Sequence, residues 1–481
     1  MIKKSFIWLF AIVVILISVV LIKTMLFSKS IPKMAAMEIP PLPEAAIAHM
    51  QEAIRIETVD YGNGIAIDTV PFEQFWKFVD KSYPLVNKLL KQQSFNKYSR
   101  LFTWEGTNPS LKPYVFMAHI DVVPIEKATE NQWTVPPFGG ILKNDLIYGR
   151  GVADDKSSVI SLLESVEKLL SQNFKPACTI YLSFGHDEET IGHSARDIAG
   201  WFIKNNIHPE VVVDEGGEIT EENFTELKRP IALIAVAEKG FMSFELSVKV
   251  EGGHSSTPAN ETAIDIITKG LFNLRKKPMP YVMSPIVKEM LQRIGPGLPF
   301  MQRMAIANSW LFESSLVHEL EKDKNSNALL RTTIVPTILQ SGVKDNVIPG
   351  LAMATVNSRI LPGQTTDEVE AFIKKQMDDS RIQIKRLNDP IHDGKSASYE
   401  SVAYKKVETV TYKIMKDVIP VPFLSVGATD SKFFQGIADG VIKYLPSIDL
   451  KGYHGIDERM HVSDLKRMVF FYELMIKDAG K

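Results

Sequence analysis

The chain has 481 residues, of which 45% are hydrophobic and 23% charged, and its formal net charge is −2. This length exceeds one ordinary hydrophobic core, so we expect a folded body of two domains. The near-neutral charge gives no indication of a nucleic acid or another polyanion as partner, and none is expected. The single cysteine, Cys178, excludes an internal disulfide framework and a multi-cysteine zinc site. Any bound metal must therefore use His, Asp and Glu.

The first predicted element is an apolar N-terminal helix. Ser5–Ile22 contains 18 residues without a charge, and at 1.5 Å per residue it spans about 27 Å, close to the thickness of a bilayer core. We predict that 5–27 is a transmembrane anchor and that the body lies outside the cytoplasm. A cleaved signal peptide and a buried helix are the alternatives. Residues 28–43 contain four prolines and are predicted to form a linker.

Residues 44–240 alternate short apolar runs with helical patterns. The predicted strands are Tyr114–Ala118, Thr179–Phe184, Val211–Val213 and Ala232–Ala237. Strand, helix and strand at these lengths predict an α/β catalytic domain with a mostly parallel sheet flanked by helices. Ligands of such sheets gather at the carboxyl ends of the strands.

The pattern changes near residue 241. Ser243–Glu251 alternates apolar and polar residues, which predicts a strand with one wet face in an antiparallel sheet. The further predicted elements are a helix at Glu261–Lys277, strands at Thr332–Leu339, Ala352–Leu361 and Ile382–Leu387, and a helix opened by a capping box of Thr365 and Glu368. We predict that 241–388 is an inserted α+β lid and that 389–481 returns to the catalytic domain. The Met- and Pro-rich segment 279–327 either lines a substrate channel or packs the lid.

Acidic and imidazole side chains recur where the predicted strands of the catalytic domain end. They are His119 and Asp121 in MAHID, Asp154 in GRGVADDK, Glu188 and Glu189 in DEET, Asp214 in VVVDEGG, and His454 in YHGIDE. Each motif alone is compatible with a solvated acidic loop or a structural histidine. Together they predict a two-metal hydrolase, because divalent ions such as zinc favour imidazole and carboxylate ligands.

In this order the motifs resemble the co-catalytic zinc metallopeptidase family of glutamate carboxypeptidase, succinyl-diaminopimelate desuccinylase and aminoacylase. The resemblance covers nearly all of 45–475. Within the family, NALLRTTIVPTILQSGVKDNVIPGLAMATVNSRILPGQT is similar to the branch of carboxypeptidase S and of the N-fatty-acyl-amino acid synthase/hydrolases. The resemblance implies a catalytic domain with an inserted lid, as predicted above, and a possible homodimer formed through the lid.

The resemblance also implies roles for individual residues. The metal ligands would be His119, Asp154, Glu189, Asp214 and His454. Asp154 would bridge two zinc ions, although cobalt or manganese would fit the same donors. Glu188 would be the general base, and Asp121 would orient His119. In the family the peptide bond after the bridging aspartate is often cis.

Other implied roles concern the substrate. His254 in GGHSSTP resembles a histidine that stabilises the oxyanion, often from a partner subunit, although a surface histidine in a turn is the alternative. Arg359 resembles the arginine that binds the terminal carboxylate of the substrate, although an ordinary wet sheet face is its alternative. Asn346 and Gly427 are further candidate substrate contacts.

The expected function is zinc-dependent hydrolysis of the amide bond next to a free C-terminal carboxylate, in dipeptides or short peptides. A metal-bound hydroxide would attack, with Glu188 as base. The alternative is hydrolysis or formation of N-acyl amino acids, which the apolar segment 279–327 and the membrane anchor favour. A non-catalytic binding protein on the same scaffold is a third possibility, and it predicts a missing ligand.

Overall fold

The computed structural model describes residues 2–27, 35–62, 64–190, 192–222, 225–387, 397–448 and 450–480. The first part of the predicted linker, 28–34, and the predicted boundary between residues 388 and 389 therefore lie outside the described residues.

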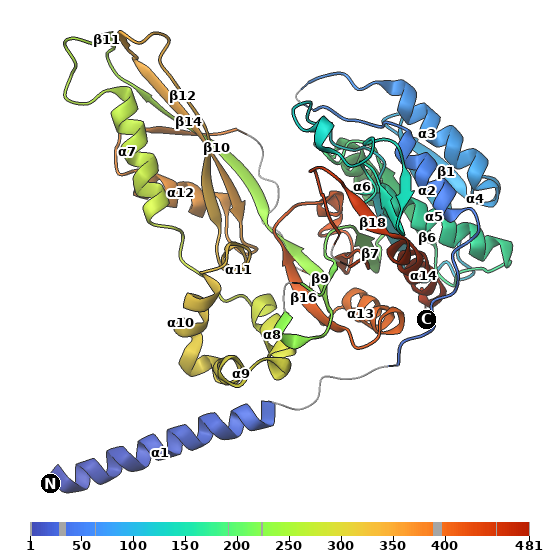
Figure 1. The fold of residues 1–481 in the computed structure, drawn as a ribbon, viewed down its shortest axis with the longest axis horizontal. Coiled ribbons are helices and arrows are strands. Elements are labelled where there is room, and N and C mark those ends of the chain that lie inside the picture. The colour runs from blue at the N-terminus through green and yellow to red at the C-terminus, as the bar shows by residue number, and fades with distance from the viewer. Residues whose placement is uncertain are drawn as a thin grey trace.

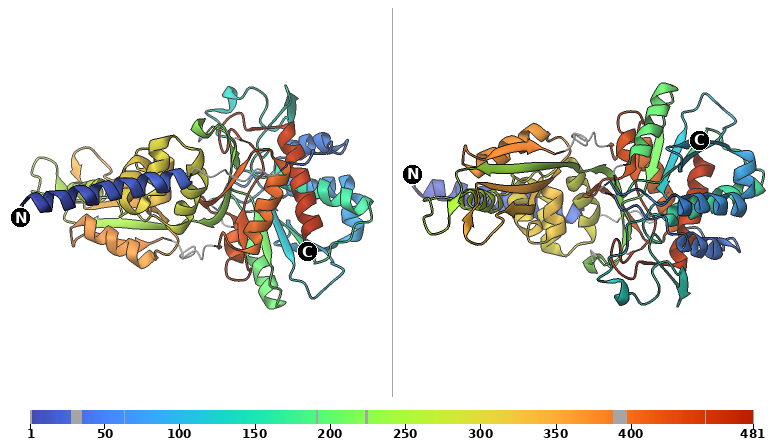
Figure 2. Two further views of the ribbon diagram at one scale, coloured as in Figure 1. Left: turned by 90° about the horizontal axis from the view of Figure 1, so that it is seen from below. Right: turned by 90° about the horizontal axis from the view of Figure 1, so that it is seen from above.

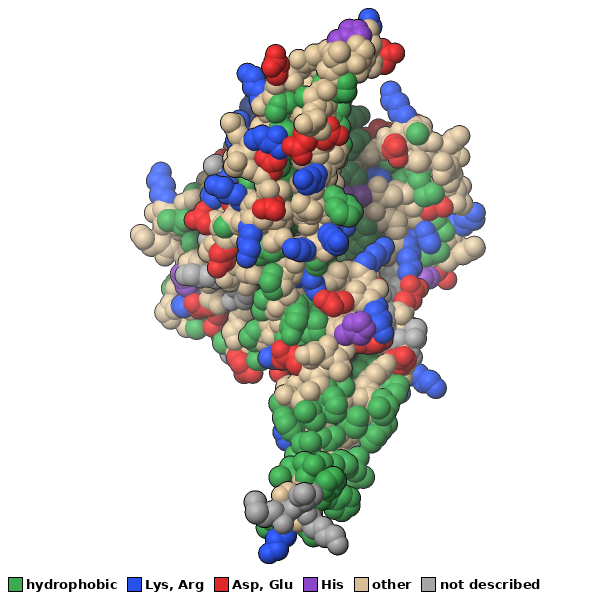
Figure 3. All heavy atoms as spheres, turned by 90° about the vertical axis from the view of Figure 1, so that its left-hand side faces the viewer, with side chains coloured by type: hydrophobic (Ala, Val, Ile, Leu, Met, Phe, Trp, Pro, Cys, Tyr) green, Lys and Arg blue, Asp and Glu red, His purple; other side chains and the backbone are tan. Residues whose placement is uncertain are grey.

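Helix α1 (Ile2–Phe27) is the predicted apolar N-terminal element. Its segment Lys4–Phe27 is long and apolar enough to cross a membrane, a test that a signal sequence near an N-terminus also passes. Its hydrophobic side chains form a continuous apolar surface at the lower end of Figure 3. The last turns contact α9 (Phe300–Ala307), where Asn308 donates hydrogen bonds to the Val20 carbonyl and the Thr24 hydroxyl, each 3.2 Å long.

A nine-stranded sheet forms the centre of the body (Figure 1). Its strand order is β1 (Lys91–Phe95), β2 (Ser99–Trp104), β6 (Ile180–Gly185), β3 (Tyr114–His119), β7 (Val211–Asp214), β17 (Val441–Lys443), β9 (Ile231–Glu238) and β16 (Ile419–Ser425), with β8 (Ile219–Thr220) paired to β9. All four strands predicted in this region are present.

The sheet is mixed, which corrects the prediction of a mostly parallel sheet. Strands β6, β3, β7 and β17 run parallel in succession, as do β9 and β16. The antiparallel pairs are β1 with β2, β2 with β6, β17 with β9 and β8 with β9. The apolar runs in the sequence locate buried strands, but they contain no information on the direction of a neighbour.

Helices cover both faces of this sheet (Figure 2). Those of the catalytic part are α2 (Ala46–Arg55), α3 (Thr69–Ser82), α4 (Pro84–Leu89), α5 (Lys156–Ser171), α6 (His193–Lys204), α13 (Val402–Ile414) and α14 (Val462–Asp478). Strand side chains alternate between the faces. Phe116 of β3 joins the core with α5, α13 and α14, while Val115 and Met117 face α6.

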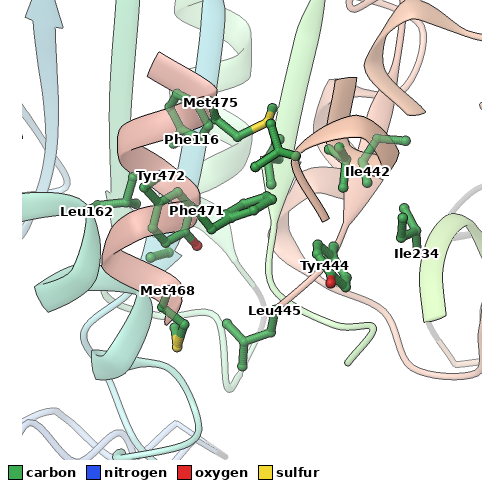
Figure 4. Packing of buried hydrophobic residues seen from close by; sticks show 14 of the residues in the cluster. Phe116, Leu162, Ile234, Ile442, Tyr444, Leu445, Met468, Phe471, Tyr472 and Met475 are labelled. Atoms are coloured by element: carbon green, nitrogen blue, oxygen red, sulfur yellow. The ribbon is translucent and has the colours of Figure 1, made fainter. Parts of the chain in front are cut away.

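Helix α14 is the centre of the larger core. Phe471 and Tyr472 point from α14 toward the sheet, between Leu162 of α5 and Ile442 of β17 (Figure 4). The ring of Tyr472 meets Phe116 edge-on at 5.8 Å between centroids. This packing connects the C-terminal helix to the strands that precede the lid.

A second, four-stranded antiparallel sheet lies within the predicted lid. Its order is β12 (Thr333–Ser341), β14 (Leu351–Ile360), β10 (Gly240–Lys249) and β15 (Gln383–Arg386). Helices α7 (Ala263–Lys276) and α12 (Thr366–Met377) pack on its apolar face, and α12 begins with the predicted capping box of Thr365 and Glu368. A small ribbon of β11 (Gly253–His254) and β13 (Val347–Ile348) ends this part of the molecule (Figure 1).

The middle of the predicted lid, residues 285–330, does not pack on the lid sheet. It forms α8 (Pro285–Ile294), α9, α10 (Ser309–Leu320) and α11 (Lys324–Leu330). Helix α8 contacts the edge strand β16, and its apolar residues belong to the core of the nine-stranded sheet and not to that of the lid sheet. Segment 285–330 therefore covers the edge of the catalytic sheet.

Candidate active site

Four of the five residues predicted to bind metal gather at the carboxyl edge of the nine-stranded sheet, together with Glu215, which was not predicted. His119 ends β3, Glu189 follows β6, and Glu215 follows β7. Because β6, β3 and β7 are parallel neighbours, these three positions meet at one edge. Asp154 lies between β5 (Leu146–Tyr148) and α5, and His454 lies in the loop before β18 (Arg459–His461). Pairing of β18 with β5 brings these two loops to the same edge.

Asp154 occupies the centre of this cluster. Its Oδ1 lies 3.0 Å from Nε2 of His119, and its Oδ2 lies 3.1 Å from Nε2 of His454. Nε2 of His454 also lies 3.2 Å from a carboxylate oxygen of Glu189. Each oxygen of Asp154 thus faces a different histidine, which is the arrangement of a carboxylate shared by two cations. The peptide bond between Asp154 and Asp155 is cis, as the resemblance implied.

On the side of His119, the structure brings in Glu215 and not its predicted neighbour Asp214. Glu215 Oε1 lies 3.2 Å from His119 Nε2. Oδ2 of Asp214 instead accepts a hydrogen bond of 2.8 Å from the backbone of Ser431. Sequence reasoning missed Glu215. Strand β7 is buried on both faces, so its sequence shows no alternation that could have identified Glu215.

Asp121 contacts both His119 and Glu189 at the edge of the cluster. Asp121 Oδ1 lies 3.4 Å from Nδ1 of His119, and that nitrogen also lies 3.0 Å from the Asp121 carbonyl. The other carboxylate oxygen of Asp121 accepts a 3.0 Å hydrogen bond from the backbone of Glu189. Asp121 therefore connects the segments after β3 and β6. Glu188 lies in the turn after β6, directly before Glu189, and its carboxylate has no hydrogen-bond partner among the residues that the structure describes.

The cluster concentrates negative charge in a buried place. Burial raises the pKa of Glu188 and of Glu215 well above the ordinary value of a glutamate. Burial would lower the pKa of His119, but Glu215 and Asp121 outweigh that effect and raise it. Hydrogen bonds to Asp154 and Glu189 raise the pKa of His454 to about 10. Without a cation, the cluster therefore retains protons.

The donor set fits a divalent metal. One group of atoms within 4.8 Å of one another comes from His119, Asp154 and Glu189, and a second comes from His119, Asp155 and Glu215. Neighbouring donors lie 3.0 to 3.2 Å apart, close to the ~3.4 Å edge of a zinc tetrahedron with bonds of ~2.1 Å. Oε1 of Glu189 and both carboxylate oxygens of Asp155 are buried without a hydrogen-bond partner in the described part of the chain. Such unpaired buried oxygens are costly unless a cation binds them.

Two predicted residues of the lid lie away from this cluster. His254 is exposed in β11, and its Nδ1 is 2.8 Å from the hydroxyl of Ser256. The carbonyl of Asn346 accepts a hydrogen bond from Ser255, so both residues occupy the tip of the lid. In Figure 1 this tip is remote from β7 and β18. Within one chain, the structure does not bring His254 or Asn346 to the metal-facing residues.

Arg359 and Gly427 lie nearer the junction of the two sheets. Arg359 is in β14 opposite Phe241, and its guanidinium lies 5.0 Å from the centre of that ring. Burial lowers the pKa of Arg359, and it makes no ion pair with any described residue. Gly427 follows β16, where its carbonyl accepts a hydrogen bond from Ser425. The backbone of Ser425 in turn accepts one from Lys239, at the entry to the lid.

The sequence and fold match known proteins over most of the chain. The profile of Peptidase family M20/M25/M40 matches residues 115–478. The chain is 38% identical to human N-fatty-acyl-amino acid synthase/hydrolase PM20D1 over 440 residues, which cover 89% of this chain and 87% of the human protein. It is 35% identical to the probable carboxypeptidase S-like 2 of Dictyostelium discoideum over 444 residues, or 90% of this chain and 84% of that protein.

A solved structure shows the same fold. The M20 family metallo-carboxypeptidase Sso-CP2 from Sulfolobus solfataricus aligns with a TM-score of 0.66 at 18% identity, covering 90% of this chain and 99% of its own. Both the profile and the relatives above 30% identity extend across the catalytic part and the lid. The chain is an enzyme of the metallopeptidase and amidohydrolase type, and it belongs to the Peptidase family M20/M25/M40.

Proposed function

We propose that this enzyme hydrolyses the amide bond next to a free C-terminal carboxylate, in dipeptides or short peptides. The observation that supports it most directly is Asp154, whose two oxygens face His119 and His454 at 3.0 and 3.1 Å. His119, Asp154, Glu189, Glu215 and His454 would hold two zinc ions, with cobalt or manganese as substitutes. Glu215 here takes the place that the sequence assigned to Asp214. When bound, the ions would polarise the amide carbonyl and acidify the attacking water.

The side chains around the ions would move the protons. Glu188 is free of hydrogen-bond partners among the described residues and lies next to Glu189, so it can accept a proton from the attacking water and pass it to the leaving nitrogen. Asp121 holds the far nitrogen of His119 and thereby fixes its tautomer. Arg359 would bind the terminal carboxylate with its guanidinium. His254 would reach the reacting carbonyl from the lid of a partner subunit.

The Glu188→Gln variant tests this assignment. The variant keeps the size of the side chain but cannot accept the proton, so turnover of a Gly-Xaa dipeptide should fall by at least about 100-fold. Zinc content should stay at the wild-type level, since Glu188 is not a proposed ligand. Retained turnover would remove Glu188 from its role, and wild-type protein without bound transition metal would contradict the whole proposal.

A second candidate substrate, an N-acyl amino acid, is favoured by a cavity between the catalytic sheet and helices α8 and α11. The cavity has a volume of about 510 Å³, and one of its lining residues, Gly216, directly follows Glu215 in the chain. Its apolar walls include Met290 and Leu291 of α8 and Phe423 of β16. Of the two relatives described above, one is an N-fatty-acyl-amino acid synthase/hydrolase and the other is a probable carboxypeptidase S-like protein. Such an apolar chamber would accept a long acyl chain.

Met290→Trp, which fills this cavity, separates the two candidates. If acyl chains bind there, the variant should raise the KM for an N-long-acyl amino acid and leave that for a Gly-Xaa dipeptide unchanged. Leu311→Trp, on the exposed side of α10, is the matched control. Absence of wild-type activity on the acyl compound would exclude this candidate and leave the dipeptide candidate intact.

A further inference from the structure

A buried carboxylate outside the proposed ligand set connects the two loops of the metal cluster. Glu458 is fully buried. Its Oε1 accepts hydrogen bonds from the backbone of Ala153 (2.8 Å) and of Asp154 (3.2 Å). Its Oε2 accepts one from the backbone of Gly151 (3.0 Å) and pairs with Arg150 at 2.6 Å. One side chain thus holds the segment that presents Asp154, although it lies only four residues after His454 in the chain.

Arg150 makes the reciprocal connection. Its Nη1 binds Glu458, and its Nη2 donates a 3.0 Å hydrogen bond to the carbonyl of Gly455, the residue after His454. The guanidinium also lies 5.5 Å from the ring centre of Trp133, and Arg150 itself is 3% exposed. The two loops therefore hold each other. Glu458 belongs to the loop of His454 and binds the loop of Asp154. Arg150 belongs to the loop of Asp154 and binds the loop of His454.

The surrounding backbone leaves little room for the two loops to shift. The Gly149 N–H donates to the Glu458 carbonyl at 2.9 Å, and pairing of Arg459 with Tyr148 continues the contact into β18 and β5. Gly151 has a φ of 87°, and a Cβ there would meet Val122 at 2.6 Å. The loop at Asp154 can follow this path only with glycine at position 151.

We propose that Glu458 and Arg150 are positioning residues for the metal centre. They fix the spacing between Asp154 and His454, whose facing atoms are 3.1 Å apart although the residues are 300 positions apart in the chain. Neither residue supplies a metal donor. Their contribution is to hold two donors at the separation that a cation requires, as residues behind metal ligands do. This inference rests on the proposed metal centre.

A buried ion pair could instead serve folding alone, so the test needs a control for that role. Asp464 and Arg467 form a second buried pair, within α14, and neither is among the proposed ligands. Loss of one partner from either pair leaves a buried charge and should destabilise the fold. Only the pair of Glu458 and Arg150 should also change the affinity for metal.

The experiment compares Glu458→Gln with Asp464→Asn in the full chain. Zinc affinity is measured by competition with a chromophoric chelator, and thermal unfolding is followed after metal removal. We expect Glu458→Gln to weaken zinc binding about 10- to 100-fold, and Asp464→Asn to leave it within about threefold of wild type. Both variants should lower the unfolding temperature of the metal-free protein.

A milder variant covers the case in which Glu458→Gln does not fold. Arg150→Lys keeps the charge opposite Glu458 but cannot bind both Glu458 and Gly455, so zinc affinity should again fall while folding is retained. Zinc affinities equal to that of Asp464→Asn would overturn the inference for both positions. Wild-type protein that binds no zinc would instead refute the metal centre itself, so the two failures are distinguishable.

Discussion

Zinc affinity should depend more on Glu215 than on Asp214, in contrast to what the sequence motif suggests. The carboxylate of Glu215 lies 3.2 Å from Nε2 of His119, whereas Asp214 binds the backbone of Ser431. Glu215→Gln removes the negative charge of a proposed donor. Asp214→Asn keeps an oxygen that can still accept the hydrogen bond from Ser431.

The size of the difference follows from these positions. A residue that only supports metal ligands typically contributes 10- to 100-fold to affinity, which is about 1.4 to 2.7 kcal/mol. Asp214→Asn should stay within this range. Glu215→Gln should exceed it, with a loss above about 100-fold. Competition of the full chain with a chelator of known zinc affinity measures both variants. A larger loss for Asp214→Asn than for Glu215→Gln would show that the orientation of this strand end has been misjudged.

Three further predictions concern substrate, subunits and pH. Arg359→Met should weaken cleavage of a dipeptide about 10- to 100-fold, because a charge-assisted hydrogen bond contributes about 1.5 to 3 kcal/mol. The already slow cleavage of its C-terminal amide should not change, and an equal loss on both substrates would contradict carboxylate recognition. If His254 acts in a partner's site, Glu188→Gln and His254→Ala copies should each be inactive. Their equimolar mixture, after exchange of subunits, should regain about a quarter of wild-type activity, since half of the dimers are mixed and each has one intact site; a mixture without activity argues against a shared site. After metal removal, the free energy of unfolding should fall as the pH rises from about 5 toward 10, the raised pKa of His454, because raised pKa values of Glu188, Glu215 and His454 let the folded chain bind more protons than the unfolded chain. Urea titrations across that range would measure it, and stability that increases with pH would refute the assigned shifts.

Most of the metal-facing set could be predicted from the sequence because it depends on where strands end. His119 directly follows one apolar run and Glu189 lies in the turn after another, and parallel neighbours place such positions together. The choice between Asp214 and Glu215 needed finer information. Val213 belongs to the larger core and Val212 to the smaller one, so a shift of one residue exchanges the faces. Three consecutive valines contain no signal that distinguishes these faces.

The sequence pattern of a segment predicts its secondary structure, but it does not specify which distant segment it packs against. The alternation at 243–251 predicted β10 and its antiparallel sheet, since one wet face is visible in the residues themselves. The helices of 285–330 lie within the predicted lid 241–388 in the chain. In the structure, however, α8 packs on β16 of the catalytic sheet. The sequence does not distinguish Glu458 from an ordinary exposed glutamate. The three backbone N–H groups that bind its carboxylate belong to residues about 300 positions earlier in the chain.

The contact between Asp154 and His454 also bears on the order in which the proposed centre can assemble during synthesis. A ribosome releases the segment of His119 and Asp154 long before His454, because the two facing residues are 300 positions apart and the lid lies between them in the chain. A chain that stops before His454 would lack the histidine that faces Oδ2 of Asp154. On the proposed ligand set, such a partial chain should show no hydrolase activity.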